Sequence, residues 1–545
     1  MIKKMIAAAL AALLALSLAG CGKTAAPEAP AAPNYEIERI TVGTTAQIEK
    51  AVMGEYNYEM LASGVTHVPL VRQDTEGAFH PQVVSWESPD PKTWIYTVAD
   101  GMKWQDGESL TADDILFTLQ YEDENGSANL KDQTDSEGKV TKAKYESAAV
   151  SDDGRSITLT LASPNVRELG NMNSFRVLPR HIYEGKAELS DEELRFGYGP
   201  YVFDSFSPEA GTIVFKASET YPEAPHAGEI VYRLFANEDT MYMALQEGDI
   251  DMVWVYSGGI PAGYQDVLSA ADNVDLLSVP AQNEPCVLAF NNAKGPFANE
   301  DLRHAAALVI DYDEIRSRVG SPLAQIPAAG FVPASTFGYT PTESLRTDLA
   351  EAESFMNKAG YTKNADGKFV DENGEQFGFT LTYRADRANH GSCAELIKSA
   401  IDAFGGNVTL EALDSDSYNA KTSNKFSENN ITMEAALFGY TTAGMGMGNG
   451  LGTIYVDGNH AVQGGAQVYD EEFSGILAKM AAAATPEEYT AACAEMQGYY
   501  AEHLPVVALY WDSLCYGVSS RLGGVTIDNA FGLNCAADWA SVTLK

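Results

Sequence analysis

The sequence predicts an α/β protein with mixed sheets, and three observations carry this prediction. In 94–98 and 157–161 apolar residues alternate with polar ones, which is the period of a half-buried strand. In 396–404 the apolar residues keep helical spacing, and the run stops at two glycines. This helix lies between apolar alternations at 379–383 and 408–410, so the three segments form a βαβ unit.

Two helix starts are also readable from the sequence. Thr111 followed by Asp114 is typical of a capping box, because each side chain satisfies a backbone N–H of the first turn. Thr485 followed by Pro486 is typical of an N-cap with proline at the first helical position, where no N–H is needed. Both signals precede segments with apolar residues on one helical face.

Composition narrows the class of protein. The chain has 545 residues, 45% of them hydrophobic, and a formal net charge of −40. At roughly 150 residues per domain, this length corresponds to three or four structural units. The acidity argues against a nucleic-acid binder, since affinity for a phosphate backbone needs clustered cations. It argues equally against electrostatic attachment to anionic lipid.

The N-terminus predicts export and a lipid anchor. Two lysines precede the apolar stretch 6–19, which suits a signal peptide and is too short to span a bilayer. The stretch runs into Leu18-Ala-Gly-Cys21, which resembles the bacterial lipoprotein box, where the signal is cut before a cysteine that becomes diacylated. We therefore expect a signal peptide over 1–20, then the lipidated Cys21 and a flexible Ala/Pro-rich tether over 21–34. The alternative is an ordinary signal peptide with a chance cysteine.

No catalytic signature is readable: the sequence lacks GxSxG, HExxH, a P-loop and GxGxxG. The glycine-rich run 445–452 has the wrong spacing for a nucleotide fingerprint, so we interpret it as a loop. The segment 371–374 lacks the alternating acidic ligands of an EF-hand and suits a β-turn. With Cys21 lipidated, an odd number of cysteines remains, and pairing of Cys515 with Cys535 stays open. We expect no cofactor and no metal.

Several separated segments resemble one protein family. The segment 90–114 looks like the most recognisable signature of the peptide/nickel class (family 5) of extracytoplasmic solute-binding proteins, which feed ABC importers. Further matching segments follow in the family's order: 197–201 (GYGPY), 245–251 (LQEGDID), 290–297 (FNNAKGPF), 301–306 (DLRHAA) and 504–510 (LPVVALY). The resemblance covers essentially the whole mature chain. These motifs are turns, caps and strand entries, so they identify the scaffold and do not contact a ligand.

The resemblance implies a two-lobed, periplasmic-binding-protein-like fold of type II with an extra domain inserted in the first lobe. We place the first lobe at 35–60, 190–280 and 506–545, the extra domain at 61–189, and the second lobe at 281–505.

The same resemblance implies the function. The protein captures a small ligand between the lobes, an oligopeptide or peptide-like solute, and delivers it to the permease subunits of an ABC transporter. It implies neither an enzyme nor a nucleic-acid partner. We expect a monomer held by the lipid on Cys21 at the outer face of the cytoplasmic membrane, or in the periplasm.

One position departs from the family's pattern. Its peptide binders usually carry an aspartate for the peptide's α-ammonium, three residues after an aromatic that follows a second-lobe strand. Here 433–439 is that strand and Tyr440 the aromatic, but Ala443 occupies the acidic position. Because a buried ammonium without a counter-charge costs several kcal/mol, a free peptide N-terminus needs another acid. Asp386 is one substitute, and Glu434 is another if the register is shifted.

The candidate ligand-binding residues lie at strand ends that face the space between the lobes. They are Thr44 and Thr45 after the first strand, Trp254, Tyr256 and Ser257 after Asp251, Arg384, Asp386, Arg387, Asn389 and His390 after 379–383, and Tyr440 and Thr441. The aromatic rings would form an apolar wall, and Arg384 or Arg387 would hold a carboxylate bidentately.

Three alternatives stay open. A metal-chelate binder, similar to the family's nickel-chelate binders, would use His390, Cys393, Met445 and Met447 as soft ligands. A cell-envelope hydrolase would need a nucleophile and a base that the sequence does not display. A sensor that presents its ligand to a signalling partner would use the same fold.

The lipoprotein box generates the first prediction. Cys21→Ala removes the acylated thiol, so we expect no incorporation of labelled fatty acid and release of a soluble, folded body from the membrane fraction. Fatty-acid labelling followed by membrane fractionation measures both. An alanine variant that stays membrane-bound, beside an unlabelled natural chain, would refute the anchor.

Overall fold

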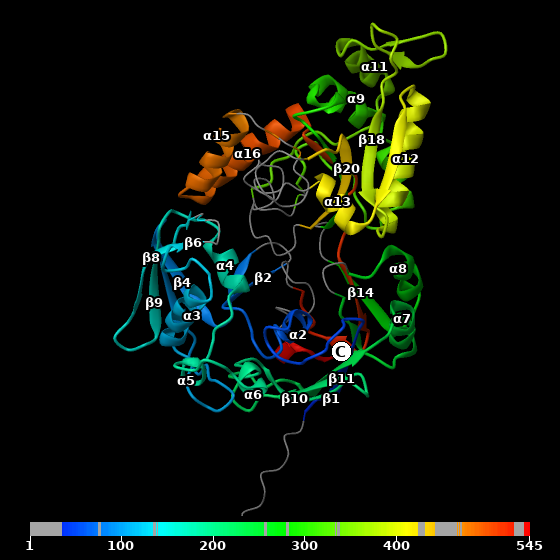
Figure 1. Cartoon of the computed structure of the whole chain (residues 1–545). Coiled ribbons are helices and arrows are strands. Elements are labelled where there is room, and N and C mark those ends of the chain that lie inside the picture. Colours follow the sequence, from blue (N-terminus) through cyan, green and yellow to red (C-terminus); the bar gives the residue numbers. More distant parts are fainter. Residues whose placement is uncertain are drawn as a thin grey trace, which may run out of the picture. The chain divides into compact units, whose positions relative to one another are not determined.

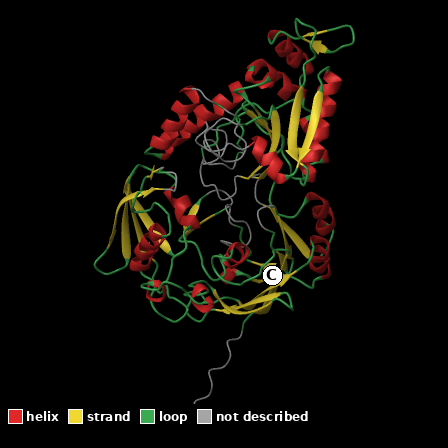
Figure 2. Cartoon of the chain, viewed as in Figure 1, coloured by secondary structure: helices red, strands yellow, loops and turns green. Residues whose placement is uncertain are grey.

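The computed structural model describes residues 35–74, 78–134, 138, 140–255, 259–278, 283–332, 334, 338–422, 431–441, 466, 468, 471–527 and 539–545. Ile37–Lys545 forms one compact unit. Its described residues include sheets of seven, five and four strands, with helices beside each of them (Figure 1). Helices and strands intermingle along the chain, which confirms the α/β class with mixed sheets (Figure 2).

The seven-stranded sheet gathers strands from both ends of the chain. Its order is β10 (Tyr201–Ser207), β11 (Thr212–Ala217), β12 (Ala227–Leu234), β1 (Ile37–Thr44), β13 (Met252–Val253), β22 (Cys515–Ser519) and β14 (Val274–Ser278). The helices α2 (Tyr56–Ala62), α7 (Glu238–Glu247) and α8 (Ala262–Ser269) belong to the same segments. Asp251, from the LQEGDID segment, accepts hydrogen bonds from Thr41 N (2.9 Å) and Arg521 Nε (2.8 Å). This motif residue therefore ties β1 to the chain just after β22.

The five-stranded sheet contains the predicted βαβ unit. Its order is β19 (Val408–Leu413), β18 (Phe379–Arg384), β20 (Ala435–Thr441), β15 (Asn283–Phe290) and β21 (Val506–Ala508). The helix α12 (Ala388–Phe404) connects β18 to its parallel neighbour β19 and runs beside these strands (Figure 1). It ends at Gly405, whose φ of 121° favours glycine. These findings confirm the predicted unit and its stop signal.

Further helices surround this sheet, and both of its faces are buried. The helices are α9 (Glu300–Val309), α10 (Tyr312–Arg318), α11 (Leu349–Lys358), α13 (Ser415–Thr422), α15 (Glu471–Ala482) and α16 (Pro486–His503). In β15, Leu288 and Phe290 belong to one hydrophobic cluster, whereas Val287 and Ala289 belong to another. Alternate residues of one strand thus serve two cores. The predicted N-cap of α16 is confirmed, since Thr485 Oγ1 accepts from Glu488 N.

The four-stranded sheet is antiparallel. Its order is β4 (Val84–Asp90), β5 (Thr93–Val98), β9 (Ser156–Leu161) and β8 (Tyr145–Val150). The apolar residues of β5 and β9 share one cluster with residues of α3 (Ala112–Glu124). The predicted capping box of α3 is present, with Thr111 N donating to Asp114 Oδ2 at 2.9 Å. The short helices α4 (Glu168–Ser174), α5 (Arg180–Tyr183) and α6 (Asp191–Leu194) follow.

The remaining strands form four short pairs. They are β2 (Val71–Gln73) with β3 (Phe79–Pro81), β6 (Gln133–Thr134) with β7 (Val140–Thr141), β16 (Thr362–Lys363) with β17 (Phe369–Val370), and β23 (Leu522–Gly523) with β24 (Thr543–Leu544). Between β17 and β18 the segment 371–374 is a turn, in which Gly374 N donates to Asp371 O, as the sequence predicts.

A close approach of two backbone segments explains the glycines of the GYGPY segment. A Cβ on Gly197 would lie 2.2 Å from the Thr66 carbonyl oxygen, and a Cβ on Gly199 would lie 2.4 Å from that of Val65. The same Thr66 oxygen accepts hydrogen bonds from the N–H groups of Tyr198 (3.0 Å) and Gly199 (2.8 Å). Only glycine leaves room for this contact. The motif therefore joins the segment after α2 to the entry of β10.

One predicted boundary is wrong. We expected 506–545 to belong to the first lobe, but β21 (Val506–Ala508) pairs with β15 in the five-stranded sheet. The chain enters the seven-stranded sheet only at Cys515, through β22. The apolar run around Pro505 is a strand of the second sheet, because β15 offers it an unpaired edge beside two cores. The other lobe boundaries stay predictions.

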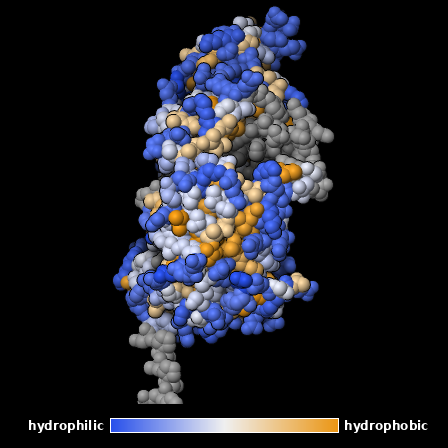
Figure 3. All heavy atoms as spheres, turned by 90° about the vertical axis from the view of Figure 1, so that its left-hand side faces the viewer, coloured by the Kyte–Doolittle hydropathy of each residue, from blue (hydrophilic) through white to orange (hydrophobic). Residues whose placement is uncertain are grey.

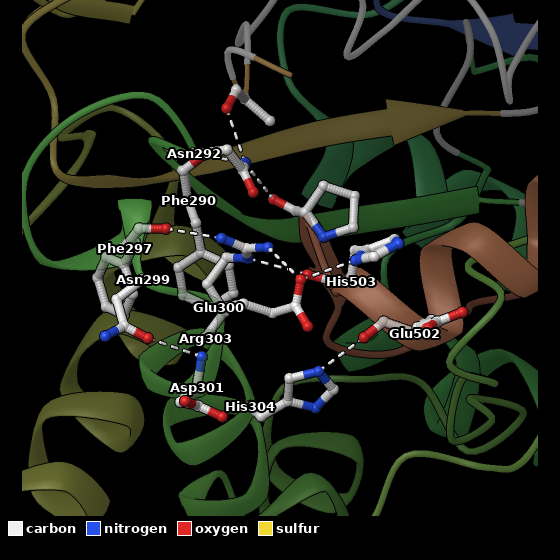
Figure 4. A network of polar contacts seen from close by, with 12 residues as sticks. Phe290, Asn292, Phe297, Asn299, Glu300, Asp301, Arg303, His304, Glu502 and His503 are labelled. Atoms are coloured by element: carbon white, nitrogen blue, oxygen red, sulfur yellow. Dashed lines mark hydrogen bonds and ion pairs between the residues drawn. The ribbon is translucent and has the colours of Figure 1, made fainter. Parts of the chain in front are cut away.

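A buried arginine of the DLRHAA segment joins α9 to the end of α16 (Figure 4). Arg303 is 6% exposed, and its Nε donates to the carbonyl oxygen of His503 at 2.9 Å. Its Nη1 donates to the carbonyl oxygen of Phe297 at 2.9 Å. Beside it, His304 Nε2 lies 2.8 Å from the carbonyl oxygen of Glu502. Carbonyls in the last turn of a helix have no intrahelical partner, so these two side chains cap α16 from outside.

The face in Figure 3 is largely hydrophilic, and the described cysteines are buried. Hydrophilic residues cover most of the face in Figure 3, with smaller hydrophobic patches among them. Cys286, Cys393, Cys493 and Cys515 are buried, and burial raises the pKa of Cys515 to about 11. Cys535 lies outside the described residues.

In the part of the chain that the structure describes, no helix combines the length and apolar character that a membrane crossing requires.

The capping arginine generates the second prediction. Arg303→Met leaves two carbonyl oxygens without a buried donor, so we expect a loss of about 2–4 kcal/mol in the free energy of unfolding. Urea denaturation followed by circular dichroism measures it. The control is Arg318→Met, which removes a 61% exposed side chain from an ion pair with Glu314 and should cost less than about 1 kcal/mol. Equal losses in the two variants would contradict the capping role.

Candidate functional site

Three strands of the five-stranded sheet end at the same edge. The parallel register of β18 with β19 sets Arg384 opposite Leu413, and the parallel register with β20 sets Thr382 opposite Ala436. We call the resulting edge, made of residues 384–389, 413–414 and 440–441, the β18 edge. In open α/β sheets, ligands bind outside the carboxyl ends of the strands.

Two predicted site residues form an ion pair on the β18 edge. Arg384 Nε donates to Asp386 Oδ1 at 2.9 Å, and its Nη2 donates to Oδ2 at 2.5 Å. The side chains are 26% and 57% exposed. Hydrogen bonds from Arg384 lower the pKa of Asp386, and the carboxylate raises the pKa of Arg384. Each charge thus already has a partner that a ligand would have to replace.

The next predicted residues open α12. Arg387 is the exposed N-cap residue and makes no side-chain cap, whereas Asn389 is half-buried. His390 is 1% exposed and shares the buried side of α12 with Cys393. We expected His390 in the site, but its ring packs inside the protein, because it falls on the apolar face of the helix.

Thr44 and Trp254 meet at a second strand edge. β1 and β13 run parallel, and Trp254 N donates to Gly43 O at 2.8 Å. Thr44 is 1% exposed and its Oγ1 accepts from Ala46 N, while Thr45 is half-buried. Trp254 is 4% exposed and belongs to the core of the seven-stranded sheet. Both residues are therefore buried in packed surroundings, and their contact with a ligand stays a prediction.

Several predicted site residues cannot be placed. Tyr256, Ser257 and Ala443 lie outside the described residues. Tyr440 and Thr441 are in β20, which continues past the predicted end at 439, but the description does not include their side chains.

Glu434 lies at the wrong end of the strands to meet a ligand amine on the β18 edge. Its Oε2 accepts from Thr380 N at 2.7 Å, near the start of β18. Its backbone oxygen accepts from Asn291 N at 3.0 Å. Leu381 of β18 faces Ala435 of β20, the residue after Glu434. Glu434 therefore holds the strand starts together, and Asp386 as the acid for a ligand amine stays a prediction.

The sequence analysis missed Asp414, which follows β19 on the β18 edge. Asp414 accepts hydrogen bonds from Asp416 N (3.0 Å) and Ser417 N (3.0 Å), and these bonds lower its pKa. The signal was available, because Asp-Ser-Asp-Ser, three residues beyond the predicted strand 408–410, is typical of a helix cap. Nearby, Tyr418 Oη donates to the Leu437 carbonyl oxygen at 2.7 Å and links α13 to β20.

Among the described residues, no group of three or more His, Cys, Asp or Glu side chains is arranged to hold a metal ion. Of the soft ligands that we considered, His390 and Cys393 are buried in α12, and Met445 and Met447 lie outside the description.

The chain belongs to the bacterial extracellular solute-binding proteins of family 5, whose model matches residues 78–459. This confirms the resemblance of the sequence motifs. A nickel-binding periplasmic protein of Escherichia coli is 23% identical over 360 residues, which cover 65% of this chain and 66% of that protein. The periplasmic murein peptide-binding protein MppA of the same organism is 27% identical over 319 residues, or 54% of this chain and 57% of that protein. The chain thus spans less than two thirds of the length of these relatives.

Solved structures confirm the fold. An oligopeptide-binding protein of an ABC transporter from Thermotoga maritima matches with a TM-score of 0.76 at 17% identity, over 93% of this chain and 99% of that one. The ABC transporter substrate-binding protein CtaP from Listeria monocytogenes matches with a TM-score of 0.75 at 20% identity, over the same shares. The mixed α/β architecture is therefore the type II periplasmic-binding fold.

The ion pair on the β18 edge generates the third prediction. Arg384→Gln removes the donor that stabilises the carboxylate, so we expect the pKa of Asp386 to rise towards its ordinary value. Carboxyl-carbon NMR over a pH titration measures it. Asp414 is the internal control, because its pKa is lowered by Ser417 and should not move. A shift of both carboxyl groups together would indicate a general structural change instead.

Proposed function

We propose that this protein captures a small solute, an oligopeptide or a peptide-like molecule, and delivers it to the permease subunits of an ABC transporter. It acts by binding and release and carries out no covalent chemistry. Membership of the family supports the binding role, and the known family members whose names are given above are binding proteins. A lipid on Cys21 holds the protein outside the cytoplasmic membrane.

The ion pair on the β18 edge is the observation from which we infer the chemical class of the ligand. It presents a cationic and an anionic side chain within hydrogen-bonding distance of each other, at the end of β18 and in the turn that follows it. A zwitterionic ligand matches this pair, because its carboxylate replaces Asp386 at the guanidinium and its ammonium replaces Arg384 at the carboxylate. A peptide with free ends is such a molecule. With alanine at position 443, Asp386 is the acid that receives the amine.

A metal chelate is the second candidate ligand. The specific observation in its favour is the similarity to the nickel-binding protein of Escherichia coli. An anionic chelate would use Arg384 and Arg387 alone, and Asp386 would then repel it. The two ligand classes therefore make opposite demands on Asp386.

The fourth prediction follows from this contrast. Asp386→Asn should weaken binding of unblocked di- to pentapeptides by about tenfold or more, while their N-acetylated counterparts lose little affinity. Ala443→Asp should strengthen binding of the unblocked peptides. Isothermal titration calorimetry with matched peptide pairs measures these affinities.

The control is Asp371→Asn, in the exposed turn before β18. Unblocked peptides that bind Asp386→Asn as tightly as the natural chain would overturn the assignment of the amine. Tighter binding of nickel chelates by Asp386→Asn would favour the second candidate.

A further inference from the structure

A buried carboxylate fixes the turn that leads from β9 into α4. Glu168 is 0% exposed and is the first residue of α4. Its Oε1 accepts from Tyr145 Oη at 2.6 Å, and its Oε2 accepts from Asn171 Nδ2 at 2.7 Å. Lys144 Nζ lies 3.7 Å from Oε2 and supplies the counter-charge. Because a buried carboxylate with satisfied partners rigidifies its surroundings, the residues just before it are held in place.

Val166, two positions before this carboxylate, packs against a different part of the molecule. It contacts the hydrophobic cluster that includes Tyr489 and Cys493 of α16 together with residues of the five-stranded sheet. Leu169, three residues later, packs against the cluster of the four-stranded sheet instead. The turn from β9 into α4 therefore lies between two hydrophobic cores, and Val166 serves the core to which α16 belongs.

Arg167 adds a polar contact with the same helix. It is the N-cap residue of α4, but its side chain makes no cap there. It hydrogen-bonds to the hydroxyl of Tyr489, which is 1% exposed. Burial raises the pKa of Tyr489, and Arg167 acts in the opposite direction because its charge favours the phenolate. A guanidinium keeps its charge and its donors at an interface, so the contact does not depend on pH in the ordinary range.

These contacts join parts of the molecule that can move relative to one another. The C-terminal connection between the five-stranded and the seven-stranded sheet runs from Trp511 to Leu514, which belong to the two different cores. Trp511 N donates to Gln325 O at 3.0 Å, so residues 512–513 are the ones that can absorb a change of angle. The four-stranded sheet is tied to the seven-stranded sheet through the GYGPY contact. Opening at 512–513 would therefore pull α16 away from the turn before α4.

We propose that Val166 and Arg167 form a latch, which holds α16 and the five-stranded sheet against the four-stranded sheet in the ligand-free protein. They are positioning residues and do not touch the ligand. A ligand that binds between the lobes then finds the closed arrangement already populated, so closure consumes less of its binding free energy. The latch thus raises the affinity for every ligand by the same factor. This effect on affinity rests on the proposed function, whereas the latch itself rests on the contacts.

Small-angle X-ray scattering of the ligand-free full chain tests the latch, in a Cys21→Ala background that prevents acylation. Val166→Asp combined with Arg167→Glu places carboxylates against an apolar core and removes the donor to α16, so the closed arrangement is penalised. We expect a larger radius of gyration, with the circular dichroism of the natural fold. The control Arg155→Glu reverses the charge of a 51% exposed side chain just before β9 and should leave the radius unchanged. An unchanged radius in the folded double variant would overturn the latch.

Two milder variants measure the effect on affinity by isothermal titration calorimetry. Arg167→Gln and Tyr489→Phe each remove one partner of the hydrogen bond, and each should weaken binding of trialanine and of N-acetyl-trialanine by the same factor, about two- to tenfold. The combined variant should bind no more weakly than either single variant. Unequal losses for the two peptides would place Arg167 in the ligand site and overturn its positioning role. If neither peptide binds the natural chain, the proposed peptide class fails, and the scattering result still decides the latch.

Discussion

The parallel alignment of β18 with β19 and β20 is the constraint on which the candidate site depends. Because side chains alternate along a strand, a shift of one residue would exchange the buried and exposed faces of β18. Leu381 and Phe379 are buried in the core beneath α12, and they fix the register. Arg384 and Asp386 then reach this edge from the end of β18, and Asp414 reaches it from the end of β19. The positions of the candidate site residues thus depend on apolar contacts in the core, away from the strand ends.

The same edge explains why charge is available there without being destabilising. Arg384 and Asp386 satisfy each other on an exposed surface, where desolvation is small and water solvates both groups. An unpaired charge at this position would either stay fully solvated or impose a penalty on any ligand that covered it. Under the proposed function, a closed pair that opens for a matching ligand would avoid both outcomes, and selectivity would depend on what replaces each charge.

The helices and strands were predictable from the sequence where local signals and the pattern of buried residues indicate the same element. The unit β18-α12-β19, the capping box of α3 and the N-cap of α16 follow from periodicity and cap chemistry, which act within a few residues. Val506–Ala508 was predicted to belong to the first lobe, but it pairs with β15 in the five-stranded sheet. The two strands are more than two hundred residues apart in the sequence, and no local pattern encodes such a contact.

The site was harder to predict than the scaffold. His390 and Trp254 have side chains that serve binding or packing equally well, and only the fold decides that both are buried. Arg384 and Asp386 were identified because they follow a strand in the chain. Their pairing with each other was not, since it depends on the conformation of a turn. Asp414 was missed because the predicted strand ends at 410, and the residues that follow it were not considered.

The position of β22 has a consequence for the order in which the molecule assembles. The seven-stranded sheet places Cys515–Ser519 between β13 and β14, strands that are made more than two hundred residues earlier. Until the final thirty or so residues are available, β13 and β14 lack the strand that lies between them. The four-stranded sheet, whose strands span 84–161, has all of its partners much sooner. Contacts of such long sequence separation form slowly. The C-terminal residues therefore complete the sheet to which the first strand of the chain, β1, belongs.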